Sequence, residues 1–174
     1  MNFELMDMFD LAELGNLTLF KEKYDKEKLN GKTKSGFGLL HNAVIGHKWD
    51  IAEFLINEGI DVNLKNSDGN TALHYLCNEG SKTHTEVMKL IQMVLDRGAS
   101  VNELNKEHST PLIKASAKSN GPGFERFKLL LNYNPDIYVQ NKAGMSCFIL
   151  AEQTKDFFGD PADYNLLKEK GLIK

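Results

Sequence analysis

A recurring pattern constrains this chain more than any other feature of its sequence. His41 and His74 occupy the same place in two copies of the pattern and lie 33 residues apart. The copies are SGFGLLHNAV (35–44), DGNTALHYLC (68–77), EHSTPLIKAS (107–116) and AGMSCFILAE (143–152). A fixed period of this length is the signature of repeat proteins, in which each unit buries its apolar face by stacking on its neighbours. The sequence therefore predicts a stacked solenoid.

Each copy is expected to hold two short helices followed by a turn. Leu73, Leu76 and Cys77 follow the i, i+3, i+4 spacing of an apolar helix face. Side-chain oxygens can cap the first helices, and the expected cap residues are Thr71, Thr110 and Ser146. The second helices should end at residues that accept the left-handed backbone conformation: Gly59, Gly98, Asn134 and Gly171.

These motifs resemble the ankyrin repeat. DGNTALH (68–74) and STPLI (109–113) are similar to the threonine-proline-leucine-histidine signature of that family. EGIDVN (58–63) and RGASVN (97–102) are similar to its closing turn. The resemblance covers about residues 32–173 and implies an all-α solenoid of stacked helix-turn-helix units with projecting β-hairpin fingers, with ten helices in five pairs.

We expect a single ankyrin-repeat domain over residues 1–174. Its units are a degenerate N-terminal cap at 6–31, repeats at 32–64, 65–103 and 104–139, and a C-terminal cap at 140–174. Extra residues at 80–86 and 119–124 are expected in the loops between paired helices, where added length costs little. Caps at both ends argue against a fragment that has lost its partner domains.

Charge and composition exclude several classes of protein. The net charge is −3 and the pI is about 6.0, so no nucleic-acid-binding surface is expected. No apolar run approaches the roughly 18 residues of a membrane-spanning helix, and the acidic N-terminus lacks the basic start of a secretory signal. Cys77 and Cys147 lie far apart, which argues against a disulfide framework and favours the reducing cytoplasm.

One bias in composition concerns the source of the chain. There are 19 Lys residues but only two Arg residues, Arg97 and Arg126, and Asn is abundant. We interpret this bias as the mark of an AT-rich, bacterial genome.

No arrangement of residues indicates catalysis or a metal site. His41 and His74 recur at the repeat period, and in ankyrin repeats this histidine hydrogen-bonds within the turn and joins adjacent units. The other histidines are expected in solvated loops: His47, His84 and His108. Cys77 lies three residues after His74, but its place on the apolar helix face predicts a raised thiol pKa and no nucleophile. No cofactor, no metal and no enzymatic activity are therefore predicted.

Two aromatic features need separate interpretation. Trp49, the only tryptophan, aligns near the start of a second helix, so packing in the core or between repeats is preferred to a role in binding. Phe157 and Phe158 are expected in the loop between the last two helices. Two adjacent residues cannot both lie on the same face of a helix. Capping of the C-terminal unit is preferred for this pair to an exposed role.

The resemblance places the partner-binding surface on the concave side, made by the fingers and the first helices. Phe37 and Met145 are apolar residues at positions expected to face solvent, which makes them candidate anchors. The alternative for Phe37 is packing on its neighbouring finger. The full set of candidate contact residues is Lys34, Ser35, Phe37, Ser67, Asp68, Asn70, Asn78, Glu79, Lys106, Glu107, Ser109, Lys118, Lys142 and Met145.

Three functions remain open from the sequence. The preferred one is a monomeric adaptor or inhibitor that binds another protein and carries out no catalysis. A sharper version is an immunity protein that neutralises a bacterial toxin. The competing class is a small thiol- or metal-dependent enzyme, which would need a depressed thiol pKa at Cys77 or Cys147 or a bound metal.

Overall fold

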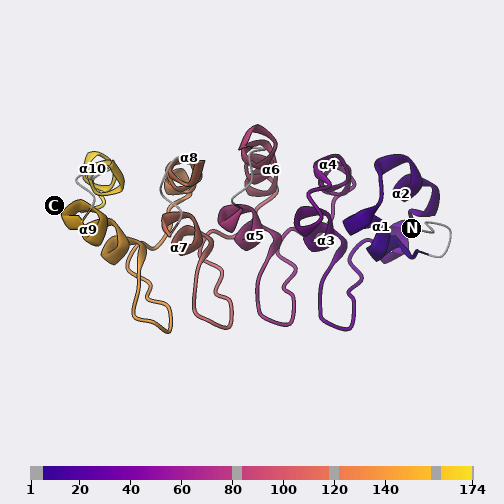
Figure 1. Ribbon diagram of the computed structural model, residues 1–174, viewed down its shortest axis with the longest axis horizontal. Helices are drawn as coiled ribbons and strands as arrows, with labels where there is room; N and C mark the ends of the chain where they lie inside the picture. Colours follow the sequence, from indigo (N-terminus) through magenta and orange to yellow (C-terminus); the bar gives the residue numbers. More distant parts are fainter. Residues whose placement is uncertain (1–5, 80–83, 118–121, 158–161, 174) are drawn as a thin grey trace.

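The computed structural model describes residues 6–79, 84–117, 122–157 and 162–173. Within these residues ten α-helices form five pairs stacked in one row, which confirms the predicted all-α solenoid (Figure 1). The pairs are α1 (Met8–Leu14) with α2 (Leu17–Lys23), α3 (Leu39–Ile45) with α4 (Trp49–Asn57), α5 (Ala72–Asn78) with α6 (His84–Asp96), α7 (Pro111–Ser116) with α8 (Pro122–Leu130), and α9 (Cys147–Phe157) with α10 (Ala162–Glu169). Short 3-10 turns follow α2 and α8 as η2 (Lys26–Lys28) and η3 (Leu131–Tyr133).

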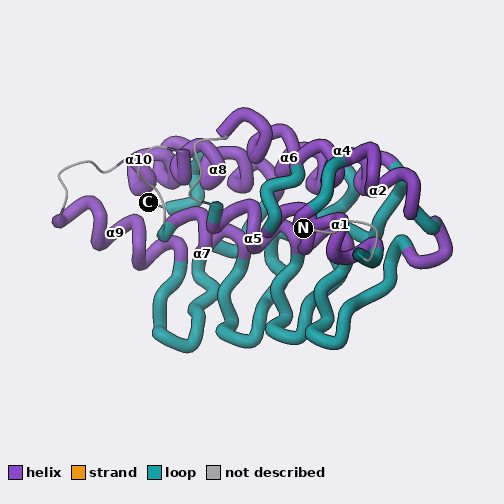
Figure 2. Tube along the Cα trace, turned by 45° about the vertical axis from the view of Figure 1, so that its right-hand side comes forward, coloured by secondary structure: helices purple, strands orange, loops and turns teal. Residues whose placement is uncertain are grey.

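The helices lie in two layers, and long loops project from one side (Figures 1 and 2). The first helices of the pairs form the layer next to the projecting loops, and the second helices form the outer layer. Contacts run along each layer from one unit to the next, as a solenoid requires. No helix in the described ranges is long and apolar enough to cross a membrane.

A continuous apolar core runs between the two layers. In α3 Leu39 and Ala43 are fully buried, and in α4 Ile51 and Leu55 are fully buried. The i, i+4 spacing of each pair places both side chains on one helix face. The following units repeat this face with Leu73, Leu76 and Cys77, with Val87, Ile91 and Val94, and with Leu112, Ala115, Phe127 and Leu130. Each unit therefore buries its apolar face against its neighbours.

Two of the three predicted caps bond to the helix backbone. Thr110 Oγ1 accepts a hydrogen bond from the Ile113 N–H at 3.2 Å, and Ser146 Oγ accepts from the N–H three residues later at 3.1 Å. Thr71 differs, because its hydroxyl lies 2.9 Å from the ring nitrogen Nδ1 of His74. The histidine takes the place of the helix backbone as the partner of this hydroxyl.

The projecting loops are hairpin fingers held by asparagine side chains. The only β-bridge among the described residues is the isolated pair Lys32 and Gly38, so the predicted β-hairpins lack regular strands. Asn105 Oδ1 accepts from the N–H groups of Glu107 and Ser109, both at 2.9 Å. The equivalent side chains in the flanking fingers are Asn66 and Asn141. These bonds satisfy backbone donors that a strand ladder would otherwise pair.

Asparagines of the closing turns join each unit to the next. Asn63 Oδ1 accepts from the Ser100 N–H at 2.9 Å, and its Nδ2 donates to the Gly98 carbonyl at 2.9 Å. One unit later Asn102 Oδ1 accepts from the Asp136 N–H at 2.8 Å. The asparagine that ends each closing turn therefore fixes the spacing between units.

The inserted residues of the second repeat are partly helical. The helix α6 begins at His84, so residues 84–86 form its first turn and the prediction that they belong to a loop is wrong. This helix has 13 residues, whereas α4 and α8 have 9 each. Residues 80–83, residues 118–121 and Phe158 lie outside the described residues, as does the side chain of Phe157. The interpretation of the phenylalanine pair therefore stays a prediction. The division into units after residues 31, 64, 103 and 139 also stays a prediction.

We predict that Asn105→Ala lowers the free energy of unfolding by about 2 kcal/mol, because two backbone N–H groups lose their acceptor in a largely buried place. Chemical denaturation followed by circular dichroism measures the change. The control is Asn57→Ala at an exposed position of α4, which should change stability by less than about 0.5 kcal/mol. A loss no larger than in this control would show that the finger does not depend on Asn105.

Candidate partner-binding surface

The tips of the four fingers are joined in one row (Figure 2). Backbone hydrogen bonds connect each tip to the next: the Ser67 N–H donates to Ser35 at 3.2 Å, the Lys106 N–H to Asp68 at 2.8 Å and the Lys142 N–H to Glu107 at 3.0 Å. These bonds hold the tip side chains of successive units at a fixed spacing. We call the residues Lys34–Gly36, Ser67–Gly69, Lys106–His108 and Lys142–Gly144 the finger row.

Buried histidines support the fingers from inside. His74 Nε2 lies 3.0 Å from the Ser109 carbonyl, and its Nδ1 accepts from the Thr71 N–H at 3.1 Å. Because a carbonyl only accepts and an N–H only donates, the ring is neutral with its proton on Nε2. Burial lowers the pKa of His74 to about 4. His41 forms the same bonds one unit earlier, which confirms that both histidines join adjacent units.

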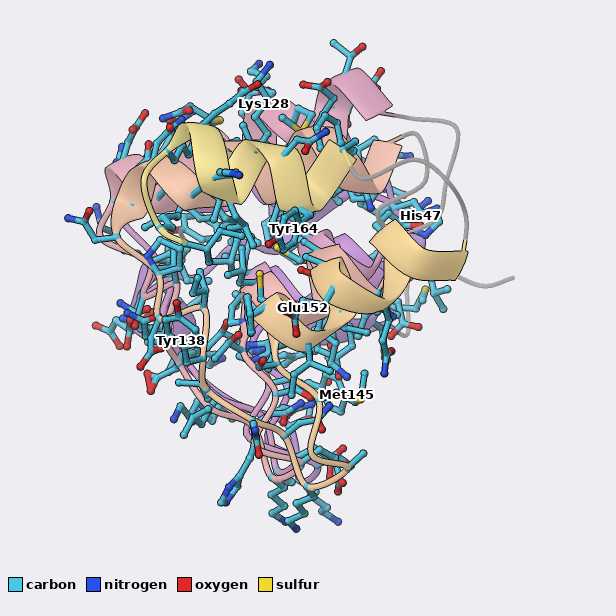
Figure 3. The ribbon with its side chains drawn as sticks, turned by 90° about the vertical axis from the view of Figure 1, so that its left-hand side faces the viewer. His47, Lys128, Tyr138, Met145, Glu152 and Tyr164 are labelled. Carbon is cyan, nitrogen blue, oxygen red and sulfur yellow. The ribbon has the colours of Figure 1, made fainter. Side chains whose placement is uncertain are left out.

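Most of the predicted contact side chains are exposed. They lie in the finger row or at the end of α5: Lys34, Ser35, Ser67, Asp68, Asn78, Lys106, Glu107 and Lys142. Phe37, Asn70 and Met145 are half-buried, and Met145 lies beside the last finger in Figure 3. That these side chains contact a partner stays a prediction.

Phe37 packs on other aromatic rings. Its centroid lies 5.9 Å from the ring of His41 in an edge-on arrangement, and 6.2 Å from the ring of Tyr75 in α5. The Tyr75 hydroxyl accepts from Asn66 Nδ2 at 2.9 Å, which fixes the tyrosine ring. Phe37 is therefore one member of an aromatic group that spans two units, and only part of its surface is available to a partner.

Two of the predicted contact residues, Ser109 and Glu79, are not part of the exposed surface. Ser109 is 3% exposed, because it lies at the base of its finger, where its carbonyl accepts from His74. Glu79 lies against His47 at the far end of α5, with 3.0 Å between the carboxylate Oε2 and the imidazole Nε2. Lys118 lies outside the described residues.

Glu79 also lies beside a buried arginine. Arg126 of α8 is 1% exposed, and its Nη1 donates to the backbone carbonyl of Glu79. Burial lowers the pKa of this guanidinium, while the nearby Glu79 carboxylate opposes that change. A buried cation needs such partners, so the structure gives Glu79 a structural role.

The sequence interpretation missed two side chains of the first helices, Tyr75 and Lys114. They border a hollow of about 90 Å³ at the base of the second finger, lined by Asn70, His74, Tyr75, Asn78 and Lys114. Both residues directly follow the recurring histidine position. The alignment of the repeats could have identified Tyr75 and Lys114. The residue that follows a buried position of a helix lies toward the edge of the buried face.

The residues considered for chemistry serve packing and hydrogen bonding. Cys77 is fully buried, and burial raises the pKa of its thiol to about 12. The raised pKa agrees with the prediction from the sequence. A thiol in that state is not a nucleophile at neutral pH. Cys147 is buried as well, and both ring nitrogens of His74 are engaged in hydrogen bonds. Within the described part of the chain, no three His, Cys, Asp or Glu side chains are grouped to hold a metal ion.

Trp49 packs partly against the core at the start of α4, as predicted. His47 lies in the exposed turn before α4, as expected, and its ring is stacked on the indole, with 5.1 Å between centroids and 15° between planes. The backbone of His47 has φ of 55°, in the left-handed region. That conformation and the 3.0 Å contact of Nε2 with Glu79 Oε2 hold the imidazole against the tryptophan.

The family follows from comparison with known proteins. Residues 9–102 and 39–141 match the family model described as ankyrin repeats in three copies. The chain belongs to the ankyrin-repeat family. This confirms the resemblance that the histidine-containing motifs and closing turns indicated.

The proteins similar to this chain are of several kinds. A probable 26S proteasome regulatory subunit, p28, of Saccharomyces cerevisiae is 33% identical over 152 residues, which cover 84% of this chain and 64% of the relative. A probable serine/threonine-protein kinase of Dictyostelium discoideum is 37% identical over 56% of this chain and 11% of its own length. The human ankyrin repeat and SOCS box protein 6 is 32% identical over 63% of this chain and 26% of its own length. The matched region thus spans at most 64% of these relatives.

We predict that lowering the pH from 7 to 5 destabilises the fold, and that His74 accounts for about 2 kcal/mol of the loss. Its pKa is about 4 in the folded chain, against roughly 6.5 in an unfolded chain. The unfolded state therefore binds more protons between these values, and stability falls as the pH drops through them. Urea titrations at several pH values measure the free energy of unfolding.

The variant His74→Gln provides the decisive comparison for this prediction. It should be less stable than the parent at pH 7 but should lose less stability on acidification. The control His108→Gln, at an exposed finger tip, should keep the slope of the parent. Equal slopes for the parent and His74→Gln would contradict a buried neutral imidazole.

Proposed function

We propose that this chain is a protein–protein interaction module that binds a partner along the finger row and the adjoining first helices. It acts as an adaptor or inhibitor and carries out no catalysis. The observation that carries this proposal is the set of backbone hydrogen bonds between successive finger tips, which presents exposed side chains of four units on one rigid surface. A preformed surface binds without the cost of ordering its loops.

The chemistry of the finger row favours a protein partner. Its charged residues are Lys34, Asp68, Lys106, Glu107 and Lys142. A surface that mixes both signs at short range matches a partner by local charge complementarity, whereas a nucleic acid would need a field of one sign. The half-buried rings of Phe37 and Tyr75 add aromatic area next to the row. Aromatic residues contribute much of the binding energy in protein interfaces.

The burial of Cys77 supports a function without catalysis. Its raised thiol pKa disfavours the thiolate that a nucleophilic cysteine needs. We place the protein in the reducing cytoplasm, because both cysteines are free and buried. We propose that it acts as a monomer, with the finger row left open for its partner.

The yeast relative suggests which partner to test first. That relative is a probable regulatory subunit of the 26S proteasome and is similar over most of this chain. We therefore propose a regulatory component of the proteasome as the first candidate partner. The bacterial source and the toxin-neutralising role stay predictions from composition, because the relatives described above are eukaryotic proteins.

We predict that Asp68→Lys combined with Lys106→Glu weakens partner binding at least about tenfold, because it reverses two charges on adjoining finger tips. Both side chains are exposed, so the fold should persist. The measurement is capture of proteins from host lysate, followed by titration calorimetry with the captured partner and with purified proteasome regulatory particle.

The control is Glu125→Lys combined with Lys128→Glu, which makes the same charge reversals on α8. Lys128 lies in the outer layer, away from the fingers (Figure 3). Binding lost only in the finger variant would support the proposal, and binding retained by that variant would place the site elsewhere. If another protein is captured and the proteasome particle does not bind, the proteasome hypothesis fails while the interaction module stands.

A further inference from the structure

A pocket opens between α4 and α6, beside the turn that connects α3 to α4. Its volume is about 380 Å³, within the range of pockets that hold small ligands or a side chain of a partner. It is lined by His47, Trp49, Asp50, Glu53, Glu86, Lys89 and Leu90. His47 lies on the same side of the stack as Met145 but farther from the finger tips (Figure 3). The pocket is therefore separate from the finger row.

The pocket arises where the second repeat departs from the others. The additional first turn of α6 brings Glu86 alongside the start of α4, which has no such extension. On the α4 side the indole of Trp49 forms a wall, and the stacked ring of His47 covers part of it. The contact of His47 Nε2 with Glu79 Oε2, at 3.0 Å, holds that wall in place.

The charge of the lining is negative. Asp50, Glu53 and Glu86 contribute three carboxylates, against one ammonium group, that of Lys89. Lys89 Nζ lies 2.7 Å from Glu53 Oε1 and so links α6 to α4. Asp50 accepts from the N–H of the next residue, and no residue in the described ranges forms an ion pair with Asp50 or Glu86. Among the described residues, these two carboxylates of the lining are thus without an ion-pair partner.

We propose that this pocket binds a lysine or arginine side chain from a basic segment of a partner protein. Aromatic rings attract cations, and the two carboxylates supply charge-assisted hydrogen bonds. The alkyl stem of a basic side chain can pack on Trp49 and Leu90 while its charged end meets Asp50 and Glu86. An anionic ligand would be repelled here, and an uncharged apolar ligand would give the carboxylates no charged partner.

Trp49 provides the measurement, because it is the only tryptophan in the chain. A capped lysine–glycine peptide should change the fluorescence of Trp49 saturably at low ionic strength, and a matching glutamine–glycine peptide should not. Asp50→Asn combined with Glu86→Gln should weaken binding of the lysine peptide about tenfold. Both substitutions are isosteric at exposed positions, and circular dichroism checks that the variant is folded.

The control Glu22→Gln combined with Glu125→Gln removes the same charge from exposed sites on α2 and α8 and should bind like the parent. The finger variant Asp68→Lys with Lys106→Glu should also bind the peptide normally, so the two proposals can fail independently. The inference is overturned if the parent shows no saturable change, if the glutamine peptide binds equally, or if both carboxylate variants lose binding alike. Tighter binding of spermidine than of the peptide would also overturn it, because the site would then serve a small amine.

Discussion

Hydrogen bonds from side chains to the backbone of the next unit set the geometry on which the whole stack depends. His74 donates to the carbonyl of Ser109, and Asn63 bonds to the backbone of Gly98 and Ser100. Burial of apolar area supplies most of the stabilisation, but it has no preferred direction. Directional bonds to backbone groups are what fix the distance and rotation between units. The regular row of finger tips follows from them.

Different residues of each finger serve the fold and binding. Inside each finger an asparagine such as Asn105 satisfies the backbone, while the tip residues make bonds to the neighbouring finger only through their main chain. Tip side chains can therefore change with little effect on stability. For the same reason the fold does not name the partner, and the function must be argued from the surface. The pocket between α4 and α6 lies beside the additional turn of α6, which within the described residues is longer than α4 and α8.

Much of the architecture could be predicted from the sequence, and two errors about the contact surface have a common cause. The pairing of helices and the caps at Thr110 and Ser146 were predicted from local patterns, and the role of both recurring histidines from the resemblance to the ankyrin repeat. Ser109 was taken for a contact residue, although the chain turns inward at the base of the finger and buries it. Glu79 was assigned to the groove, but Arg126 from the next unit and His47 from the previous one hold it. These two errors, at Ser109 and Glu79, concern contacts with residues far away in the sequence.

The sequence by itself determined the period, the helix pairs, their caps and the family, because these depend on residues close together in the chain. The tertiary structure alone decided which side chains of the fingers face outward and which support them. It also placed Phe37 against Tyr75 and brought α6 beside Trp49 to form a pocket. The physical reason is that a stacked unit is completed by its neighbours, so the exposure and charge environment of a residue are set by units that local patterns do not include.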